Sequence, residues 1–357
     1  MAPLRFGIVG SGWRAEFFAR MARLMPDRFE VAALVSRSDE RRAQVGADWG
    51  VRTVATIGEL VALAPELVVV AVPWPVTPDA TRELVAAGVP VLAETPPAPD
   101  AEGLFALWAD VGASGLVQVA EHSPFMPAHT ARIHAVDDGL IGRATSVQIS
   151  STHLYHAVGL IRRLLRAGRG QVTVRATTFT APLLDPVGRD GWTGETEPRE
   201  RWNVLATLDL GGGLGALYDF SDNQWHNPLR TNRIVVRGSL GEIVDDTVTR
   251  YAGERTVVSS SIVRRVSGLE QNLDGFDLEH LSLDGRVVYR NEFHGARLAD
   301  DDLAVAGLLA ACADWLHGDG PEPYPLAEGC HDHLVGLAIE AAQRTGEAVT
   351  TPAAPWA

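Results

Sequence analysis

Small residues near the start of the chain are spaced as in a turn that binds a dinucleotide. The segment Gly7-Ile-Val-Gly10-Ser-Gly12-Trp13-Arg14-Ala15 follows an apolar run and precedes an amphipathic stretch. Gly10 permits a tight turn, Gly12 leaves room for a diphosphate, and Ala15 lets a helix pack closely on the strand. Backbone N–H groups at the helix start would face that diphosphate. A tight turn without a ligand is the alternative. We predict coenzyme contacts at Gly7, Gly10, Gly12, Trp13 and Arg14.

The residues after the second predicted strand, 29–35, indicate which coenzyme is preferred. They are Ser36-Arg37-Ser38, and the first carboxylate comes only at Asp39. An acidic side chain here would accept hydrogen bonds from a free ribose 2′-hydroxyl, whereas arginine offers donors to a 2′-phosphate. The sequence therefore favours NADP(H) over NAD(H), with Ser36 and Arg37 as contacts. The alternative is that Arg37 is solvated or stacks on adenine, in which case both coenzymes are accepted.

Two imidazoles and a phenol within four residues, His153, Tyr155 and His156, have the chemistry to move a proton. Hydride transfer at a carbinol carbon needs a partner for the hydroxyl proton, and imidazole, with an ordinary pKa of about 6.5, meets that need. All 31 basic residues are arginine, so no lysine amine is present. We predict His156 as the acid/base, Tyr155 as a hydrogen-bond donor and Thr95 as an orienting or relaying group. The alternative for His156 is a core histidine that caps sheet backbone.

Further polar and aromatic residues follow predicted strands, where doubly wound sheets place ligand-facing side chains. We predict coenzyme contacts at Pro73, Trp74, Glu94, Thr95 and Glu121, and substrate contacts at His122, His153, Tyr218 and Asp222. Tyr218 and Asp222 alternate onto one face of a strand, which is equally consistent with a subunit interface. For Glu121 and His122 the alternative is a hydrogen bond at a domain junction, and for Trp74 it is packing.

The elements that must position these residues fall into two groups. Apolar segments at 4–9, 29–35, 51–54, 67–72, 89–93 and 116–120 alternate with helical patterns, which is typical of a doubly wound parallel sheet. Beyond residue 122 the chain is rich in β-type segments, at 144–151, 172–180, 204–210, 215–220 and 233–237, with helical patterns at 303–316 and 326–344. We therefore predict an α/β chain with a Rossmann domain over 1–122. A second α/β domain over 123–357 would carry a large open, mainly antiparallel sheet.

Composition limits the partners and the compartment. A net charge of −14 and a pI near 5.2 argue against nucleic acid or an anionic membrane as the main partner. The longest apolar stretch, 67–76, is interrupted by prolines and too short for a bilayer, and the chain enters its first strand with no secretory segment. We expect a cytoplasmic protein. Cys312 and Cys330 suit reduced thiols, and the histidines of His331-Asp-His333 diverge around a helix, so we predict no metal.

Several segments together resemble the Gfo/Idh/MocA oxidoreductases. They are the N-terminal turn, the strand ending Val72-Pro73, the stretch Ala87-Gly88 to Glu94-x-Pro96, the turn Gly139-x-Ile141-Gly142 and the hairpin Val236-x-Gly238-x-x-Gly241-x-Ile243. The resemblance spans nearly the whole chain. It implies a Rossmann domain followed by an α/β domain whose open sheet forms one wall of the substrate site and a surface for a homodimer or homotetramer. It also implies oxidation or reduction of a sugar, cyclitol or similar small polar molecule with NAD(P).

The chain departs from that family at two positions. The family's Glu-Lys-Pro is Glu94-Thr95-Pro96 here, and its Asp-x-x-x-His segment corresponds to Thr152-His153-Leu154-Tyr155-His156, which keeps only the histidine. Three other functions therefore stay open. The chain could be a redox-neutral NAD-dependent glycosidase or lyase, an imine reductase similar to the thiazolinyl imine reductases, or a coenzyme-bound sensor without turnover.

Overall fold

The first sheet has six strands, and all of its pairings are parallel. The computed structural model describes residues 2–268 and 275–357. The strand order is β3-β2-β1-β4-β5-β6, with bounds β1 Leu4–Val9, β2 Phe29–Val35, β3 Thr53–Val54, β4 Leu67–Val70, β5 Val91–Ala93 and β6 Val117–Val119. Every residue of β4 is apolar and fully buried, as expected for a strand covered on both faces. The prediction of a doubly wound parallel sheet is confirmed.

The helices of this half differ in how their N-termini are capped. They are α1 Trp13–Leu24, α2 Asp39–Trp49, α3 Ile57–Val61, α4 Thr77–Ala86 and α5 Ala101–Val111. Thr56 and Glu59 form a capping box at α3, while the side chains of Ser38 and Asp100 accept hydrogen bonds at α2 and α5. The N-cap of α1 is Gly12, which has no side chain to do this. The first N–H groups of α1 are therefore left for another partner.

The second sheet has nine strands in the order β16-β15-β14-β13-β7-β12-β11-β8-β20. Their bounds are β7 Ala144–Ser150, β8 Thr173–Leu183, β11 Arg199–Gly211, β12 Leu214–Ser221, β13 Arg233–Gly238, β14 Gly241–Val244, β15 Thr247–Gly253, β16 Thr256–Ser261 and β20 Val349–Thr350. Only β7 and β12 pair in parallel, so the predicted, mainly antiparallel sheet is confirmed. β8 and β11 extend beyond the predicted segments, because their ends form a long two-stranded ribbon.

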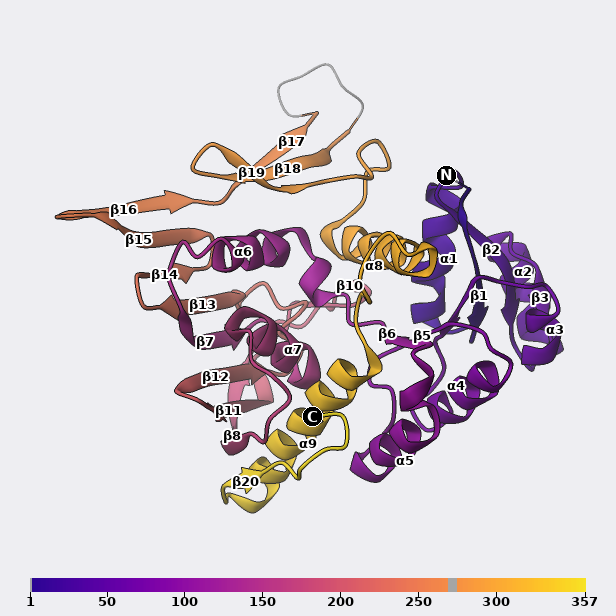
Figure 1. Cartoon of the computed structure of the whole chain (residues 1–357), viewed down its shortest axis with the longest axis horizontal. Helices are drawn as coiled ribbons and strands as arrows, with labels where there is room; N and C mark the ends of the chain where they lie inside the picture. Colours follow the sequence, from indigo (N-terminus) through magenta and orange to yellow (C-terminus); the bar gives the residue numbers. More distant parts are fainter. Residues whose placement is uncertain (1, 269–274) are drawn as a thin grey trace.

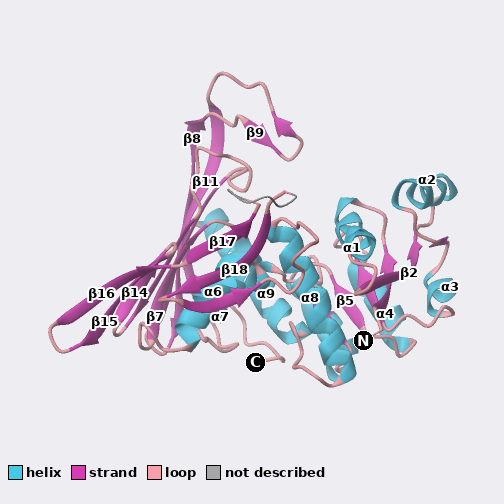
Figure 2. Ribbon diagram, turned by 90° about the horizontal axis from the view of Figure 1, so that it is seen from above, coloured by secondary structure: helices cyan, strands magenta, loops and turns pink. Residues whose placement is uncertain are grey.

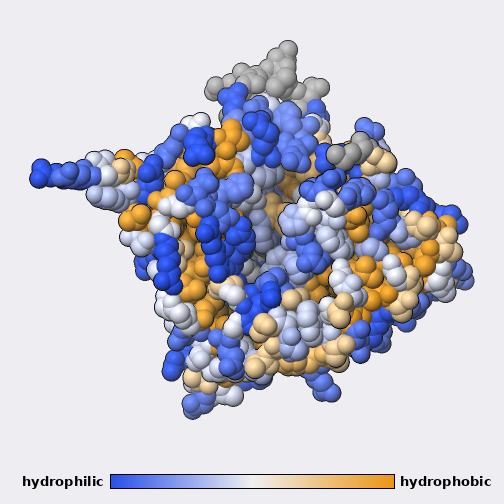
Figure 3. All heavy atoms as spheres, in the orientation of Figure 1, coloured by the Kyte–Doolittle hydropathy of each residue, from blue (hydrophilic) through white to orange (hydrophobic). Residues whose placement is uncertain are grey.

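Smaller elements complete the second half. They are a hairpin of β9 Val187–Gly188 and β10 Gly191–Trp192, a sheet of β17 Val263–Ser267, β18 Asp277–Leu283 and β19 Arg286–Arg290, and the helices α6 Pro127–Asp137, α7 Leu154–Leu165, α8 Asp300–His317 and α9 Leu326–Thr345. Helices α6, α7 and α9 lie on one side of the nine-stranded sheet, toward the first sheet (Figures 1 and 2). The far end of β15 and β16 projects from the molecule and is hydrophilic (Figure 3).

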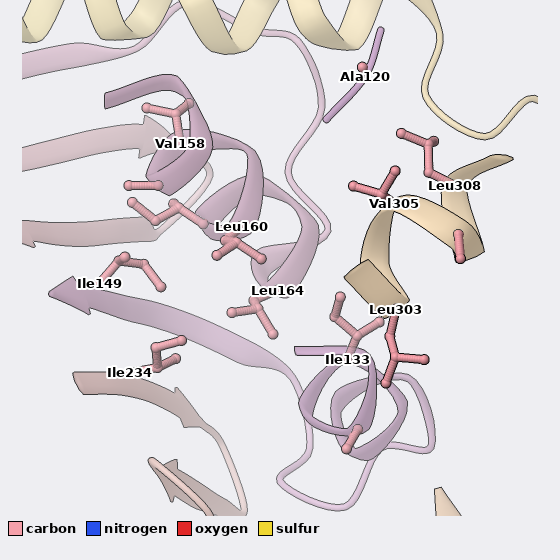
Figure 4. Packing of buried hydrophobic residues seen from close by; sticks show 14 of the residues in the cluster. Ala120, Ile133, Ile149, Val158, Leu160, Leu164, Ile234, Leu303, Val305 and Leu308 are labelled. Carbon is pink, nitrogen blue, oxygen red and sulfur yellow. The ribbon is translucent and has the colours of Figure 1, made fainter. Parts of the chain in front are cut away.

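One apolar core connects the two halves. A single cluster of buried residues includes Phe6 of β1, Ile149 of β7, Leu160 of α7 and Leu303 of α8. Figure 4 shows how side chains from α6, α7, α8, β7 and β13 meet in it. α9 packs on α7 and β8 on one side, and on α5 and β6 on the other. The β6 edge of the parallel sheet therefore packs against α9, and α1 packs against α8. Within the described ranges, no helix is long and apolar enough to cross a membrane.

Candidate active site

The turn between β1 and α1 has the shape that a dinucleotide requires. Gly10 has a φ of +121°, and a Cβ there would lie 2.1 Å from the carbonyl oxygen of Ala71, so only glycine fits. A Cβ on Gly12 would meet no heavy atom within 4 Å, so space is open over the start of α1. Uncapped helix N–H groups beside open space suit an anionic diphosphate. The residues of this turn fit the coenzyme that the sequence predicts.

Gly7 serves the packing of the first half. It lies inside β1, and a Cβ there would come within 2.7 Å of the Leu60 side chain in α3. Gly7 is therefore required for the packing of α3 on the sheet, and its contact with the coenzyme stays a prediction.

The turn after β2 brings arginines close to the dinucleotide turn. Arg37 is exposed, and the hydroxyls of Ser36 and Ser11 lie 3.3 Å apart. Arg41 donates from Nη2 to the carbonyl oxygen of Ser11 at 2.6 Å, and Arg42 donates from Nη1 to that of Ser36 at 2.7 Å. Arg41 and Arg42 were not among the predicted contacts, although the run of arginines in the first turn of α2 is visible in the sequence. Arg42 is paired with Asp39, so the charge added beside the dinucleotide turn is that of Arg41.

Arg14 connects the dinucleotide turn to the ends of β5 and β6. Its Nε donates to Glu94 at 2.7 Å, and its Nη2 lies 3.0 Å from Nδ1 of His122. The Nε2 of His122 lies 2.8 Å from a carboxylate oxygen of Asp301, in the first turn of α8. Although burial opposes the charge of Arg14, the neighbouring Glu94 carboxylate raises the pKa of that guanidinium. Asp301, a further member of this chain of polar groups, had no sequence signal, because 179 residues separate it from His122.

Glu121 and His156 form a close pair at the same sheet edge. The Nδ1 of His156 lies 2.6 Å from Glu121, whose other oxygen accepts a hydrogen bond from the N–H of Ser123. Burial alone would raise the pKa of the Glu121 carboxyl, but the charge and hydrogen bond of His156 lower it to about 2. Glu121 is therefore ionised and favours the tautomer of His156 with the proton on Nδ1. Nε2 of His156 is then a hydrogen-bond acceptor with a fixed orientation.

Two predicted catalytic residues, Tyr155 and Thr95, and the predicted substrate contact His153 lie near His156. The Tyr155 ring lies 4.5 Å from that of His156, and the His153 ring lies 5.1 Å from it. Burial raises the pKa of the Tyr155 hydroxyl above its usual range, while a hydrogen bond with Thr95 opposes the rise. Burial and the neighbouring His156 lower the pKa of His153 to about 3, so its ring is neutral. The structure thus brings His153, Tyr155, His156 and Thr95 together beside the dinucleotide turn.

Tyr218 is not a substrate contact, because it is fully buried and its hydroxyl accepts a hydrogen bond from the N–H of Leu154 at 3.1 Å. It supports the start of α7 and so holds the loop that carries His153 and His156. Asp222 lies at the end of β12 and is partly exposed, with its carboxylate 4.0 Å from Nη1 of Arg201. The alternation along β12 was predicted, but the sequence does not show that α7 covers the position of Tyr218.

Three predicted coenzyme residues lie on the surface of the first half, after β1 and β4. Trp13, Pro73 and Trp74 are exposed. The guanidinium of Arg189, in the β9–β10 turn, lies 4.1 Å from the centre of the Trp13 ring. The hairpin of the second half therefore touches the dinucleotide turn of the first half. Within 2–268 and 275–357, no group of three or more His, Cys, Asp or Glu side chains is placed to hold a metal ion.

Comparison with solved structures shows the same fold along the whole chain. An oxidoreductase from Agrobacterium radiobacter in complex with NAD+, L-tartaric acid and magnesium is similar, with a TM-score of 0.71 and 15% identity over 98% of both chains. A levoglucosan dehydrogenase in complex with NADH and levoglucosan has a TM-score of 0.69 and 15% identity, over 98% of this chain and 100% of that one. A myo-inositol dehydrogenase from Corynebacterium glutamicum has a TM-score of 0.66 and 19% identity, over 99% and 100%. Identities this low show a shared fold only.

A comparison of the sequence with family models gives one further match. No curated protein matches this chain, but residues 4–122 match the model of an oxidoreductase family with an NAD-binding Rossmann fold, the Gfo/Idh/MocA family. The match covers the six-stranded sheet and the ends of its strands, including the dinucleotide turn and Glu121. Over these residues, the first third of the chain, the protein matches the Gfo/Idh/MocA family of NAD-binding oxidoreductases.

Proposed function

We propose that this oxidoreductase oxidises or reduces a sugar, a cyclitol or a similar small polar molecule, with His156 as its acid/base. The observation that carries the proposal is the pair of Glu121 and His156 at the sheet edge beside the dinucleotide turn. The named substrates of two similar structures, levoglucosan and myo-inositol, support the substrate class.

The residues of the pair have separate tasks in this proposal. Glu121 holds the proton of His156 on Nδ1, so Nε2 accepts the proton of a substrate hydroxyl and returns it in the reverse direction. The resulting imidazolium is stabilised by the carboxylate at 2.6 Å. Tyr155 and Thr95, whose side chains lie close together, orient the substrate oxygen. When bound, a nicotinamide coenzyme accepts or supplies the hydride.

We further propose that NADP(H) is preferred over NAD(H). The exposed Arg37 follows β2 closely, and Arg41 adds positive charge beside it, whereas Arg42 is paired with Asp39. A guanidinium suits the 2′-phosphate by charge and by the geometry of its donors. Because Ser36 carries no charge and Asp39 comes later, in the first turn of α2, no carboxylate at 36–38 would repel the phosphate.

The test combines coenzyme binding with a substrate screen. Purified protein is titrated with NADPH, NADP+, NADH and NAD+ and then assayed at 340 nm with polyols, inositols and anhydrosugars. We expect tighter binding of the NADP pair, and turnover that His156→Ala reduces about 10²-fold or more without changing coenzyme affinity. His294→Ala, an exposed histidine in the loop after β19, is the matched control. Normal turnover by His156→Ala would overturn the assignment.

The same assay separates the other functions. A redox-neutral glycosidase or lyase would form product without a net change in absorbance, and a sensor would bind ligands without any product. An imine reductase would consume NADPH with cyclic imines and not with polyols. The ionised Glu121 beside His156 favours a proton-transfer enzyme over a sensor, because a binding role does not require a carboxylate that fixes the tautomer.

We also propose that the outer face of the nine-stranded sheet pairs with a second copy of the chain. Phe179 and Leu205 are nearly half exposed on this face, and Asp219 and Arg233 lie beside them. Apolar groups flanked by charges of both signs are suited to a symmetric self-contact. Sedimentation of the wild type and of Leu205→Glu tests this: a dimer or tetramer that dissociates in the variant is expected, and a wild-type monomer would contradict it.

A further inference from the structure

Three aromatic side chains form a group on the inner face of the nine-stranded sheet, beyond the start of α7. They are Trp202 of β11, Phe220 of β12 and Trp225 in the turn after β12. The Phe220 ring lies 4.7 Å from that of Trp225 and 5.8 Å from that of Trp202. The side chains of both tryptophans are more than 40% exposed, whereas Phe220 is buried between them. The group therefore presents a broad apolar surface on a buried base.

This aromatic group is next to the proposed acid/base. The Trp225 ring lies 4.8 Å from the His153 ring, nearly perpendicular to it, and the His153 ring lies 5.1 Å from that of His156. One imidazole thus separates Trp225 from His156. A molecule that places a hydroxyl at His156 and extends past His153 would reach the indole of Trp225.

The turn that carries Trp225 is held in place by amide side chains. The Nε2 of Gln224 donates to the carbonyl oxygen of Ser150 at 2.8 Å, and both groups are buried. The Nδ2 of Asn227 donates to the carbonyl oxygen of Leu184 at 2.9 Å. These bonds fix the backbone on both sides of Trp225 without burying its ring. A large apolar side chain kept exposed by a rigid backbone is typical of a binding surface.

The surroundings favour a ligand without charge. Arg201 is placed among carboxylates of Glu195 at 3.0 Å, Asp185 at 3.7 Å and Asp222 at 4.0 Å, so its charge is compensated. The His153 ring has a buried Nδ1 without a hydrogen-bond partner, and the ring is neutral. The three carboxylates outnumber the single charge of Arg201, so this region offers no free cation to an anionic group. A flat, uncharged ring would meet the faces and edges of aromatic side chains, with which it stacks favourably.

We propose that Trp202, Phe220 and Trp225 form a subsite for an uncharged aromatic ring carried by the substrate, next to the group that reacts at His156. This rests on the proposed function, because the reacting group is defined by His156. The preferred substrate is thus a sugar, a cyclitol or a similar small polar molecule that carries an aryl substituent. The subsite distinguishes such molecules from the same polar centre without a ring.

Nuclear magnetic resonance with small uncharged probes tests the subsite without a need for turnover. Phenol, cyclohexanol and methyl β-D-glucoside are added to the NADP+-saturated protein, and the indole N–H signals are followed. Trp225→Phe assigns the Trp225 signal. We expect phenol to shift that signal in the millimolar range, and cyclohexanol to bind about tenfold more weakly. Trp225→Ala should weaken phenol binding about tenfold or more. Trp192→Ala, an exposed tryptophan of the β9–β10 hairpin, should not.

Each other result overturns the proposal. If methyl β-D-glucoside shifts the Trp225 signal as strongly as phenol does, the surface binds a pyranose ring and not an aryl group. If phenol leaves the signal unchanged, there is no ring subsite. If Trp225→Ala lowers the sedimenting mass, the surface is a contact between copies. Thermal unfolding of Trp225→Ala confirms that the variant is folded, which its exposed position allows.

Failure of the subsite is distinguishable from failure of the proposed function. His156→Ala should bind phenol as the wild type does, because phenol does not need proton transfer. If His156→Ala keeps normal turnover while Trp225 still binds phenol, the acid/base assignment fails and the ring subsite stands. If turnover depends on His156 but no probe reaches Trp225, the proposed function stands and the subsite fails.

Discussion

The guanidinium of Arg14 and the carboxylate of Glu94 lie 2.7 Å apart, although 80 positions separate them in the sequence. Arg14 comes from the turn after β1 and Glu94 from the end of β5, so their ion pair spans the edge of the parallel sheet. Both side chains are largely buried, at 14% and 12% exposure. The site therefore contains a positive charge beside His122 and Glu121, in a chain without lysine.

Arg14→Met should destabilise the protein, because it leaves the Glu94 carboxylate without its partner in a mostly buried place. Breaking such a pair costs about 3 kcal/mol or more, whereas Arg82→Met, which breaks exposed pairs with Asp79 and Asp110, should cost under about 1 kcal/mol. Urea unfolding measures both. The double variant Arg14→Met/Glu94→Leu should recover part of the loss. Strictly additive losses would show that the two residues are not coupled.

Glu121→Gln should lower turnover about 10²-fold or more while coenzyme affinity stays unchanged. The amide has no charge to stabilise the imidazolium, and it can present its NH₂ group to Nδ1, which favours the wrong tautomer of His156. Glu102→Gln, an exposed residue in the first turn of α5, is the control. Steady-state kinetics and NADPH titration separate the two effects. A Glu121→Gln enzyme with normal turnover would mean that the carboxylate only supports the N–H of Ser123.

Local patterns predicted the parts of the site that depend on short segments. The dinucleotide turn is recognisable because strand, glycines and helix are contiguous, and His153, Tyr155 and His156 lie in one helical start. The parallel sheet was also predictable from short segments, since its strands are mainly apolar and β4 is apolar throughout. The spacing of these residues along the sequence could not predict which side chains pair, such as Glu121 with His156.

Contacts between distant segments were beyond reach of the sequence. Asp301 pairs with His122 only because α8 packs against α1 and brings its acidic first turn to the sheet edge. Tyr218 was wrongly assigned to the substrate, because a period of two gives the face of a strand but not whether a helix covers it. The exposure of Trp225 likewise depends on a contact between distant segments. The side chain of Gln224, in the turn after β12, donates to the carbonyl oxygen of Ser150 at the end of β7.

Arg37→Asp should change the coenzyme preference. Replacing the exposed guanidinium after β2 by a carboxylate removes a donor for the 2′-phosphate and adds an acceptor for a 2′-hydroxyl. We expect NADPH affinity to fall more than about tenfold relative to NADH affinity. Arg286→Asp, an exposed position on β19 far from the coenzyme turn, should leave both affinities unchanged. Fluorescence titration gives the ratio, and an unchanged ratio in Arg37→Asp would reject the NADP(H) preference.

Acid should destabilise the fold through its buried histidines. Burial, aided by the nearby Arg132, lowers the pKa of His129 to about 3, and burial lowers that of His333 to about 4. In the unfolded chain both have a pKa of about 6.5. Between these values the unfolded chain binds more protons than the folded one, so the free energy of unfolding falls as the pH falls.

The pH dependence can be assigned by substitution. The melting temperature of the wild type should fall between pH 7 and pH 5, and His129→Gln should show a smaller fall, because glutamine keeps an acceptor for Arg132 without taking up a proton. The exposed His294, replaced by glutamine, is the control and should show the wild-type slope. Equal slopes of melting temperature against pH in all three proteins would mean that the pKa of His129 is the same in the folded and unfolded chain. The acid sensitivity between pH 7 and pH 5 would then come from the other buried histidines with a lowered pKa, such as His333.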